Sequence, residues 1–400
     1  MLRIENRRMK LMTESKKSIL IILLACLFFS VVPERGAALG SPLRKGPYLI
    51  YAGSNTQMHI LWQTEATSID TVRWGADTTG SMNADISSEY GSDHQHNFAV
   101  TGLTPGRKYF YRVLSGGAEY KGSFRAAPDS NSTHVRFFAY GDTRSHPLIH
   151  DHIAHMMDSV FLADNDYQTL VLQSGDLVID GDNEKVWQSD FFSPELNGIQ
   201  TMIRNLPYQA CMGNHEKSGV LYKKYFPYPF AADRYWSFDY GPAHISVIDQ
   251  FVAYDSGSAQ LKWLESDLQR SKKPWKIVMF HEPGWSAGKR DSSHANNMDV
   301  QKYIEPLCEK YDVHLVICGH NHFYSRAKII TASGDSVFHI TSGGGGAPLY
   351  PLDASSPNIV TATKVNHFCE VEIVSPTELH MQAISASGEV IDKFSIIRGR

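Results

Sequence analysis

The fold is decided by the stretch at residues 135–142, which reads VRFFAYGD. A short apolar run that leads directly into a turn is typical of a buried strand, and here the turn carries Gly141 and Asp142. A run at helical spacing follows, and the next strand is expected at Thr169–Leu172. Strands that alternate with helices in this way predict an α/β domain.

Four further stretches repeat this arrangement, each with oxygen or nitrogen donors at the end of an apolar run. They are Gly175-Asp176, Gly213-Asn214-His215-Glu216, His281 and Gly319-His320-Asn321-His322. Loops at the carboxyl ends of parallel strands converge on one crevice, so we expect these side chains to lie close together. Donors of this kind suit hard or borderline divalent metals. The five stretches together predict a two-metal centre that hydrolyses phosphate esters.

The first metal of this centre is expected to be bound by Asp142, which follows the first strand. Asp176 follows the second strand and is expected to bridge both metals. His322, two residues beyond His320, can reach the first metal. A shared carboxylate is what a two-metal site requires to hold its ions close together.

The second metal is expected to be bound by the carbonyl oxygen of Asn214, with His281 and His320 alongside. His215 is adjacent to Asn214 and is not needed as a ligand. Its position instead favours donation of a proton to the leaving alkoxide.

These motifs, which lie between residues 135 and 350, resemble the calcineurin-like metallophosphoesterase superfamily, and the domain before them makes the chain most similar to bacterial relatives of the purple acid phosphatases. The resemblance implies a four-layer α/β/β/α sandwich and two divalent or trivalent metal ions, with Fe, Zn and Mn all compatible. It implies hydrolysis of a phosphorylated small molecule, here taken as a phosphate monoester, by a hydroxide that bridges the metals. It also implies the ligand set given above and makes His215 the acid.

Two departures from the family pattern affect the first metal. Most of the superfamily has Asp-x-His where this chain has Asp142-Thr143-Arg144, and purple acid phosphatases have Tyr where this chain has Ile179. The first metal is therefore one protein ligand short, and a purple iron(III) centre is not expected. His150, on the inward stripe of the helix that begins near Pro147, can fill the gap. The alternative for His150 is a buried histidine that orients Asp142.

Arg144 cannot bind a metal, because its guanidinium group stays protonated. It is interpreted either as a bidentate grip on substrate phosphate or as the salt-bridge partner of Asp142, Asp180 or Asp182. His294 lies in a polar loop and is a candidate substrate-binding residue, with a solvated surface position as the alternative.

Residues 41–127 are predicted to form a separate all-β domain of short alternating runs. The stretch Leu103–Tyr111 resembles the tyrosine corner of a fibronectin type III sandwich, and Trp62 fits the core tryptophan of such a sandwich. A generic pair of β-hairpins is the alternative. The remaining segments are a polar linker at 128–134, an α/β domain at 135–400 and its closing strands at 365–397.

Residues 1–40 are interpreted as a signal peptide. A basic segment precedes the apolar run Ile19–Val32, which is short for a membrane span of roughly 20 residues. Ala38-Leu39-Gly40 offers a cleavage site before Ser41. The mature chain is therefore expected in the periplasm or outside the cell, with no membrane span. A retained anchor helix and a lipoprotein modified at Cys26 are the alternatives.

The composition is that of an ordinary globular protein, and the basic residues are not massed in any one block. This distribution provides no nucleic-acid-binding signature. The four cysteines that remain after cleavage lack the spacing of a disulfide scaffold. Two other functions stay open: a phosphodiesterase acting on nucleotides or lipid head groups, and a surface-binding protein whose metal site is degenerate.

Overall fold

The computed structural model describes residues 43–78, 82–289, 292–353 and 356–398. The signal peptide predicted at residues 1–40 lies outside these described residues. None of the helices in the described part is both long and apolar enough to cross a membrane.

The N-terminal part consists of two small antiparallel sheets. In the described residues, one sheet contains β1 (Leu43–Ile50), β2 (Met58–Thr64) and β5 (Gln95–Val100), and the other contains β4 (Asn83–Ser87), β3 (Asp70–Gly75), β6 (Lys108–Ser115) and β7 (Ala118–Arg125). Both sheets contribute to one apolar core, in which Trp62 is fully buried. The Tyr109 hydroxyl accepts a hydrogen bond of 2.9 Å from the backbone N–H of Thr104, as expected of a tyrosine corner.

Two larger sheets form the rest of the protein. Within the described residues, the first has the strand order β10 (Tyr208–Ala210), β9 (Val171–Gln173), β8 (Val135–Tyr140), β18 (His367–Ser375), β19 (Glu378–Ser385) and β20 (Val390–Ile397). The second has the order β11 (Trp236–Tyr240), β12 (Ala243–Val247), β13 (Trp275–Met279), β14 (Val313–Cys318), β16 (Ser336–Ser342), β15 (Tyr324–Ile330) and β17 (Ile359–Thr363). The strands β8, β9 and β10 are parallel to one another, and so are β12, β13 and β14.

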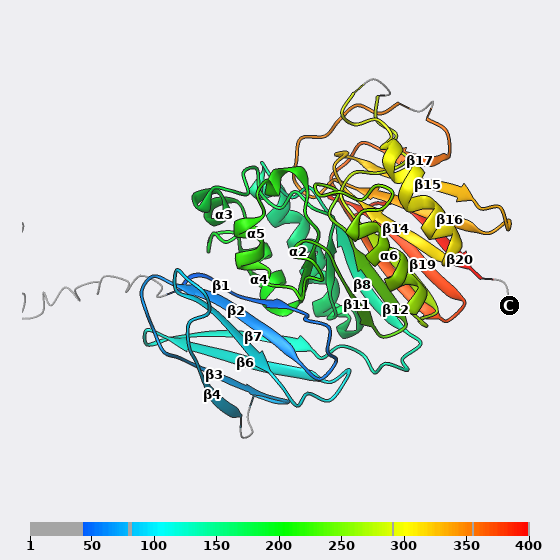
Figure 1. Ribbon diagram of the computed structural model, residues 1–400. Helices are drawn as coiled ribbons and strands as arrows, with labels where there is room; N and C mark the ends of the chain where they lie inside the picture. The colour runs from blue at the N-terminus through cyan, green and yellow to red at the C-terminus, as the bar shows by residue number, and fades with distance from the viewer. Residues whose placement is uncertain (1–42, 79–81, 290–291, 354–355, 399–400) are drawn as a thin grey trace, which may run out of the picture. The chain divides into compact units, whose positions relative to one another are not determined.

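Helices cover the outer face of each sheet, which gives the expected α/β/β/α sandwich (Figure 1). The first group comprises α2 (Pro147–Ala163), α3 (Glu184–Asp190), α4 (Asn197–Asn205) and α5 (Val220–Tyr225). The second comprises α6 (Ala259–Arg270) and α7 (Glu305–Lys310), with a π-helical turn at Val300–Ile304 before α7. Buried residues of α6 and α7 pack against Val316 of β14, and buried residues of α2 pack in the core that contains Tyr140 of β8.

The segment between Glu184 and Asn205 forms two helices, α3 and α4, rather than one continuous helix. Pro194 lies in the gap, lacks a backbone N–H and disfavours helical geometry at the residue before it. Phe191 and Phe192 turn into the core at the break. The four described cysteines, Cys211, Cys308, Cys318 and Cys369, are all buried and free.

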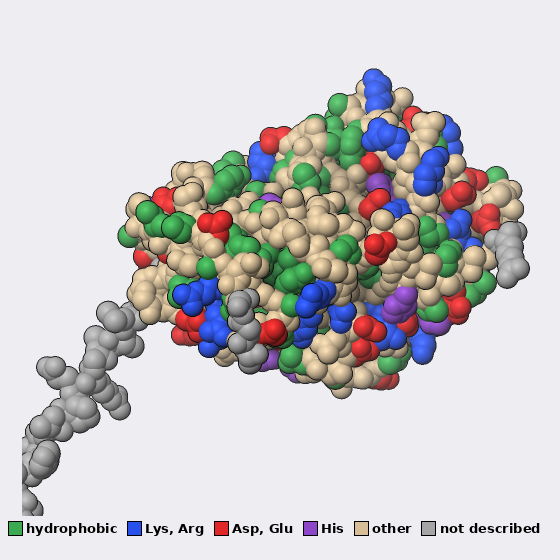
Figure 2. Space-filling view, turned by 90° about the horizontal axis from the view of Figure 1, so that it is seen from below, with side chains coloured by type: hydrophobic (Ala, Val, Ile, Leu, Met, Phe, Trp, Pro, Cys, Tyr) green, Lys and Arg blue, Asp and Glu red, His purple; other side chains and the backbone are tan. Residues whose placement is uncertain are grey.

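The N-terminal sheets contact the edge of the first large sheet through buried hydrogen bonds. The amide of Gln209, on the edge strand β10, exchanges two bonds of 2.9 and 2.8 Å with the backbone of Tyr51. The Tyr48 hydroxyl donates to the carbonyl oxygen of Tyr225 at 2.7 Å. Because buried polar groups require such partners, these bonds fix how the edge strand meets β1. On the face that Figure 2 shows, basic and acidic side chains are interspersed rather than separated into large patches.

Candidate metal centre

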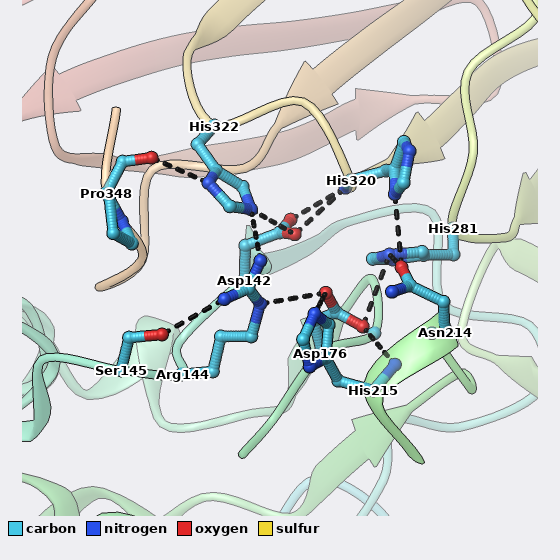
Figure 3. A network of polar contacts seen from close by, with 12 residues as sticks. Asp142, Arg144, Ser145, Asp176, Asn214, His215, His281, His320, His322 and Pro348 are labelled. Carbon is cyan, nitrogen blue, oxygen red and sulfur yellow. Dashed lines mark hydrogen bonds and ion pairs between the residues drawn. The ribbon is translucent and has the colours of Figure 1, made fainter. Parts of the chain in front are cut away.

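The polar side chains singled out from the sequence lie together at the carboxyl ends of the parallel strands (Figure 3). The residues that converge there are Asp142, Asp176, Asn214, His215, His281, His320 and His322. They follow β8, β9, β10, β13 and β14, which belong to different sheets. The site is therefore assembled where strand ends of the two sheets meet.

The backbone at this site adopts conformations that L-residues rarely take. Asp142, Asp176 and His320 have φ angles of 56°, 59° and 65°. Residues held in the left-handed region cost free energy and cluster at functional sites. The glycines of the motifs allow close approach, since a Cβ atom on Gly213 would lie 2.3 Å from Asp176 Oδ1 and one on Gly319 would lie 2.4 Å from Asp142 Oδ2.

One group of donor atoms is centred on Asn214. The Asn214 Oδ1 atom lies 3.2 Å from His281 Nε2 and 3.2 Å from His320 Nδ1, and His281 Nε2 lies 3.3 Å from Asp176 Oδ1. The other nitrogen of each ring donates to a backbone carbonyl oxygen. His281 Nδ1 donates to Ser174 at 2.7 Å, and His320 Nε2 donates to Ser293 at 3.0 Å. When a ring is neutral, its bond to the carbonyl oxygen leaves the inward nitrogen with a lone pair, and the bond also holds the orientation of the ring.

The charges around this group favour a cation. Burial opposes protonation of His281, but the Asp176 carboxylate outweighs it and raises the pKa of His281 to about 10. Burial, and then the neighbouring His281, lower the pKa of His320 to about 3. The positive charge is therefore held between Asp176 and His281, where a metal ion would replace the proton. One carboxylate oxygen, one amide oxygen and two imidazole nitrogens fit a divalent metal.

A second group consists of Asp142, Asp176 and His322, whose ligand atoms lie within 4.8 Å of one another and are buried. The His322 Nδ1 atom donates to the carbonyl oxygen of Pro348 at 2.6 Å, so Nε2 carries the lone pair and faces Asp142 Oδ1 at 3.4 Å. The Asp142 oxygens also accept from the backbone N–H of His320 at 3.0 and 2.8 Å. By residue type this group also suits a metal.

Arg144 reaches into this second group, as Figure 3 shows. Its Nε donates to Asp176 Oδ2 at 3.1 Å, its Nη2 lies 3.3 Å from His322 Nε2, and its Nη1 donates to Ser145 Oγ at 3.0 Å. The sequence indicated Asp142, Asp180 or Asp182 as its salt-bridge partner, but the ion pair is with Asp176. Two of the three residues in this group are therefore hydrogen-bonded to a guanidinium group.

His150 is not brought together with the other candidates. Its Nε2 lies 2.8 Å from the Tyr140 hydroxyl, and its ring packs on Phe191 with centroids 5.9 Å apart. Burial lowers its pKa to about 3. His150 therefore lies near the end of β8, but its ring is bonded to Tyr140, the last residue of that strand, and in this arrangement it does not complete the first site.

His294 lies over the cluster and belongs to a small aromatic group that the sequence did not predict. Its ring stacks on His320 at 5.2 Å and lies 4.0 Å from the ring of Tyr350, which itself stacks on His322 at 4.0 Å. Tyr350 also contacts Arg144. Nothing in the sequence around Tyr350 marks it. The nearby run Gly343–Gly346 packs against Asp142.

His215 is held beside Asp176 by two hydrogen bonds. Its backbone N–H donates to Asp176 Oδ1 at 2.9 Å, and its Nδ1 donates to the carbonyl oxygen of Ile179 at 2.7 Å. Its Nε2 lies 3.8 Å from Asp176 Oδ2, and the side chain is 23% exposed. The ring is therefore oriented with Nε2 toward the site and open to a ligand. Ile179, which stands where the family has Tyr, contributes its carbonyl group instead.

Glu216 supports the loop that carries Asp176. Its carboxylate accepts from the backbone N–H groups of Asp176 at 2.9 Å, Leu177 at 2.8 Å and Gly213 at 2.6 Å. Burial, and then repulsion by Asp176, raise the pKa of Glu216 to about 7. The side chain thus satisfies three backbone donors that would otherwise be buried without partners.

Comparisons with known proteins bear on both parts of the chain. Residues 45–136 match the purple acid phosphatase N-terminal domain, and residues 136–324 match the calcineurin-like phosphoesterase family. The chain is 25% identical to acid phosphatase type 7 of Homo sapiens, covering 93% of this chain and 95% of that protein. It is 28% identical to purple acid phosphatase 21 of Arabidopsis thaliana, covering 64% of this chain and 59% of that protein.

The solved structure of purple acid phosphatase PPD1 from yellow lupin has a TM-score of 0.75 to this chain at 19% identity. It covers 88% of this chain and 74% of the lupin chain. At this identity the likeness concerns the fold alone, and it includes both the N-terminal sheets and the large sandwich.

Replacing Glu216 by Gln is expected to lower the free energy of unfolding by about 1–3 kcal/mol, because an amide must place its NH2 group against buried backbone donors. Urea unfolding of the full chain, in a metal chelator, measures this change. The control is Glu195→Gln, at an exposed position between α3 and α4. Equal stabilities of the two variants would show that Glu216 does not support this loop.

Proposed function

The chain belongs to the calcineurin-like phosphoesterases, with the N-terminal domain of purple acid phosphatases, and on this premise we propose that it is an exported, metal-dependent phosphatase of phosphate monoesters. The superfamily hydrolyses phosphoric esters, and the chain is a hydrolase of that class. The proposal of a metal-dependent monoesterase rests mainly on one observation. Imidazole nitrogens gather around the carboxylate oxygens of Asp176, and His215 lies beside them.

The group formed by Asp176, Asn214, His281 and His320 would hold a divalent metal, and Asp142 and His322 extend the donor set on the other side of Asp176. Metal bound in the group centred on Asn214 would neutralise the charge of the phosphate and lower the pKa of a water molecule. Fe, Zn and Mn all suit such donors. The backbone carbonyls of Ser174, Ser293 and Pro348 keep the three imidazole rings in the orientation that metal binding needs.

His215 would supply the proton for the leaving group. The Ile179 carbonyl oxygen holds Nδ1–H, so an imidazolium at this position directs its second N–H, on Nε2, into the site. As the bond between phosphorus and the leaving oxygen breaks, its electron pair goes to that oxygen and the Nε2 proton is transferred to it.

A monoester is favoured over a diester by two considerations. The human relative is named an acid phosphatase, and its similarity extends over nearly the whole of both chains. A monoester dianion also carries more charge than a diester anion and gains more from a cationic site. His294 and Tyr350 lie over the site and would contact the group esterified to the phosphate.

The purified protein is expected to hydrolyse p-nitrophenyl phosphate with a much larger kcat/KM than bis(p-nitrophenyl) phosphate. His215→Ala should lower kcat by about 10²–10⁴-fold for an alkyl phosphate, because the alkoxide needs a proton to leave. The loss should be smaller for p-nitrophenyl phosphate, whose leaving group is stable without one. Steady-state kinetics with both substrates measure this difference.

The control for this experiment is His155→Ala, since His155 is a half-exposed histidine on α2 away from the cluster. Equal losses for the two leaving groups would contradict the acid role of His215. A preference for the bis ester would instead support the phosphodiesterase alternative, and hydrolysis of neither would support a binding protein.

Export is expected to remove the N-terminal segment at Ala38-Leu39-Gly40, so that the mature chain begins at Ser41. Cell fractionation followed by N-terminal sequencing of the purified protein tests this. An intact N-terminus in the membrane fraction would indicate a retained anchor, and a chain that begins at a lipid-modified Cys26 would indicate a lipoprotein.

A further inference from the structure

We propose that the guanidinium group of Arg144 takes the position of the first cation, so that this protein binds one metal ion, in the group centred on Asn214. The inference rests on the proposed function only in using the same cluster, and it concerns the number of metals rather than the reaction. It departs from the two-metal centre that the sequence predicts.

Two of the three residues in the Asp142–Asp176–His322 group are already bonded to Arg144. Arg144 donates from Nε to Asp176 Oδ2 at 3.1 Å, and its Nη2 lies 3.3 Å from His322 Nε2. These are the atoms that would face a metal in this group. A neutral imidazole has a single acceptor nitrogen, so a hydrogen bond to His322 Nε2 leaves that nitrogen no lone pair for a metal.

The orientation of His322 makes the competition for its lone pair direct. Its Nδ1 donates to the Pro348 carbonyl oxygen at 2.6 Å, so Nε2 is the nitrogen with the lone pair. The ring is also covered by Tyr350, with centroids 4.0 Å apart and an angle of 17° between the planes. Because the carbonyl bond and the stacked ring hold His322 in place, Nε2 bonds either Arg144 or a metal.

Charge and burial favour Arg144 in this competition. Arg144 is 9% exposed and Asp176 is 1% exposed, and a buried ion of either sign needs its partner. A guanidinium stays protonated and cannot itself bind a metal. A divalent ion in this group would therefore lie next to a fixed positive charge, whereas Arg144 itself neutralises the shared carboxylate.

The segment around Arg144 holds the guanidinium in place. The Thr143 hydroxyl donates to the Leu177 carbonyl oxygen at 3.0 Å, and Arg144 Nη1 donates to Ser145 Oγ at 3.0 Å. Ser145 itself has a φ angle of 75°, in the left-handed region. A residue in this region keeps its conformation only when its surroundings hold it, so the loop is fixed with Arg144 pointing inward.

The group centred on Asn214 differs from the other group in having no basic side chain bonded to it in the described residues. Across the described residues, no Lys or Arg side chain is hydrogen-bonded to Asn214, His281 or His320. The atoms of these side chains that could bind a metal face one another and Asp176 Oδ1. This group is therefore free to bind a metal while the other is occupied by Arg144.

The test is a count of bound metal, which does not depend on activity. The full mature chain is freed of metal with a chelator, titrated with Mn²⁺ by calorimetry and, after dialysis, analysed for metal content. The wild type should bind one equivalent. Arg144→Met, which keeps the length of the side chain and removes its charge, should bind two. Arg144→His, which adds a donor, should also bind two, with the spin coupling of a Mn²⁺ pair in its EPR spectrum.

The control is Arg326→Met. Arg326 forms an ion pair with Asp392 and lies outside the cluster, and its side chain is 13% exposed, against 11% for Arg144. This variant should bind one equivalent. Two equivalents in the wild type would overturn the proposal. One equivalent in Arg144→Met would also overturn it, because the first group would then lack a ligand rather than be occupied. If Arg144→Met does not fold, Arg144→His decides by the same count.

The two proposals fail in different ways. One equivalent in the wild type and two in the variants, without any ester hydrolysis, would sustain the role of Arg144 and refute the proposed function. Hydrolysis by a wild type that binds two equivalents would do the reverse.

Discussion

The candidate site depends on one buried carboxylate, that of Asp176. A buried anion is stable only with partners, and Asp176 has a backbone N–H from His215, the guanidinium of Arg144 and the imidazole of His281. Its own backbone is held in the left-handed region, with its N–H bound to Glu216. The negative charge is thereby fixed where both groups of metal-binding side chains meet, and it determines which cations the cluster accepts.

Much of this arrangement could be predicted from the sequence, because it follows from topology. Asp142, Asp176, Asn214, His281 and His320 each follow an apolar run, and parallel strands bring such positions to a common edge. The glycines in the motifs were also informative, since Gly213 and Gly319 lie where a Cβ atom would collide with the two aspartates.

The rest depended on side-chain directions, which sequence spacing does not give. His150 lies on the inward stripe of α2 as expected, but its ring bonds the Tyr140 hydroxyl and packs on Phe191 instead of joining the other candidate ligands. Arg144 was expected to bind phosphate or to pair with Asp142, Asp180 or Asp182, and the folded loop pairs it with Asp176 and places it against His322. Tyr350 reaches the site from a loop about 28 residues beyond His322 in the sequence, and no sequence motif surrounds it.

The central claim is that the charge of Asp176 creates a metal-dependent hydrolytic site. It is tested most directly by measuring bound metal and phosphate monoester hydrolysis in the same preparations of the wild type and of Asp176→Asn, which keeps the shape of the side chain and removes its charge. The account predicts that the wild type binds metal and is active, and that Asp176→Asn loses both. Full activity in Asp176→Asn, or a wild type that binds no metal, would contradict it.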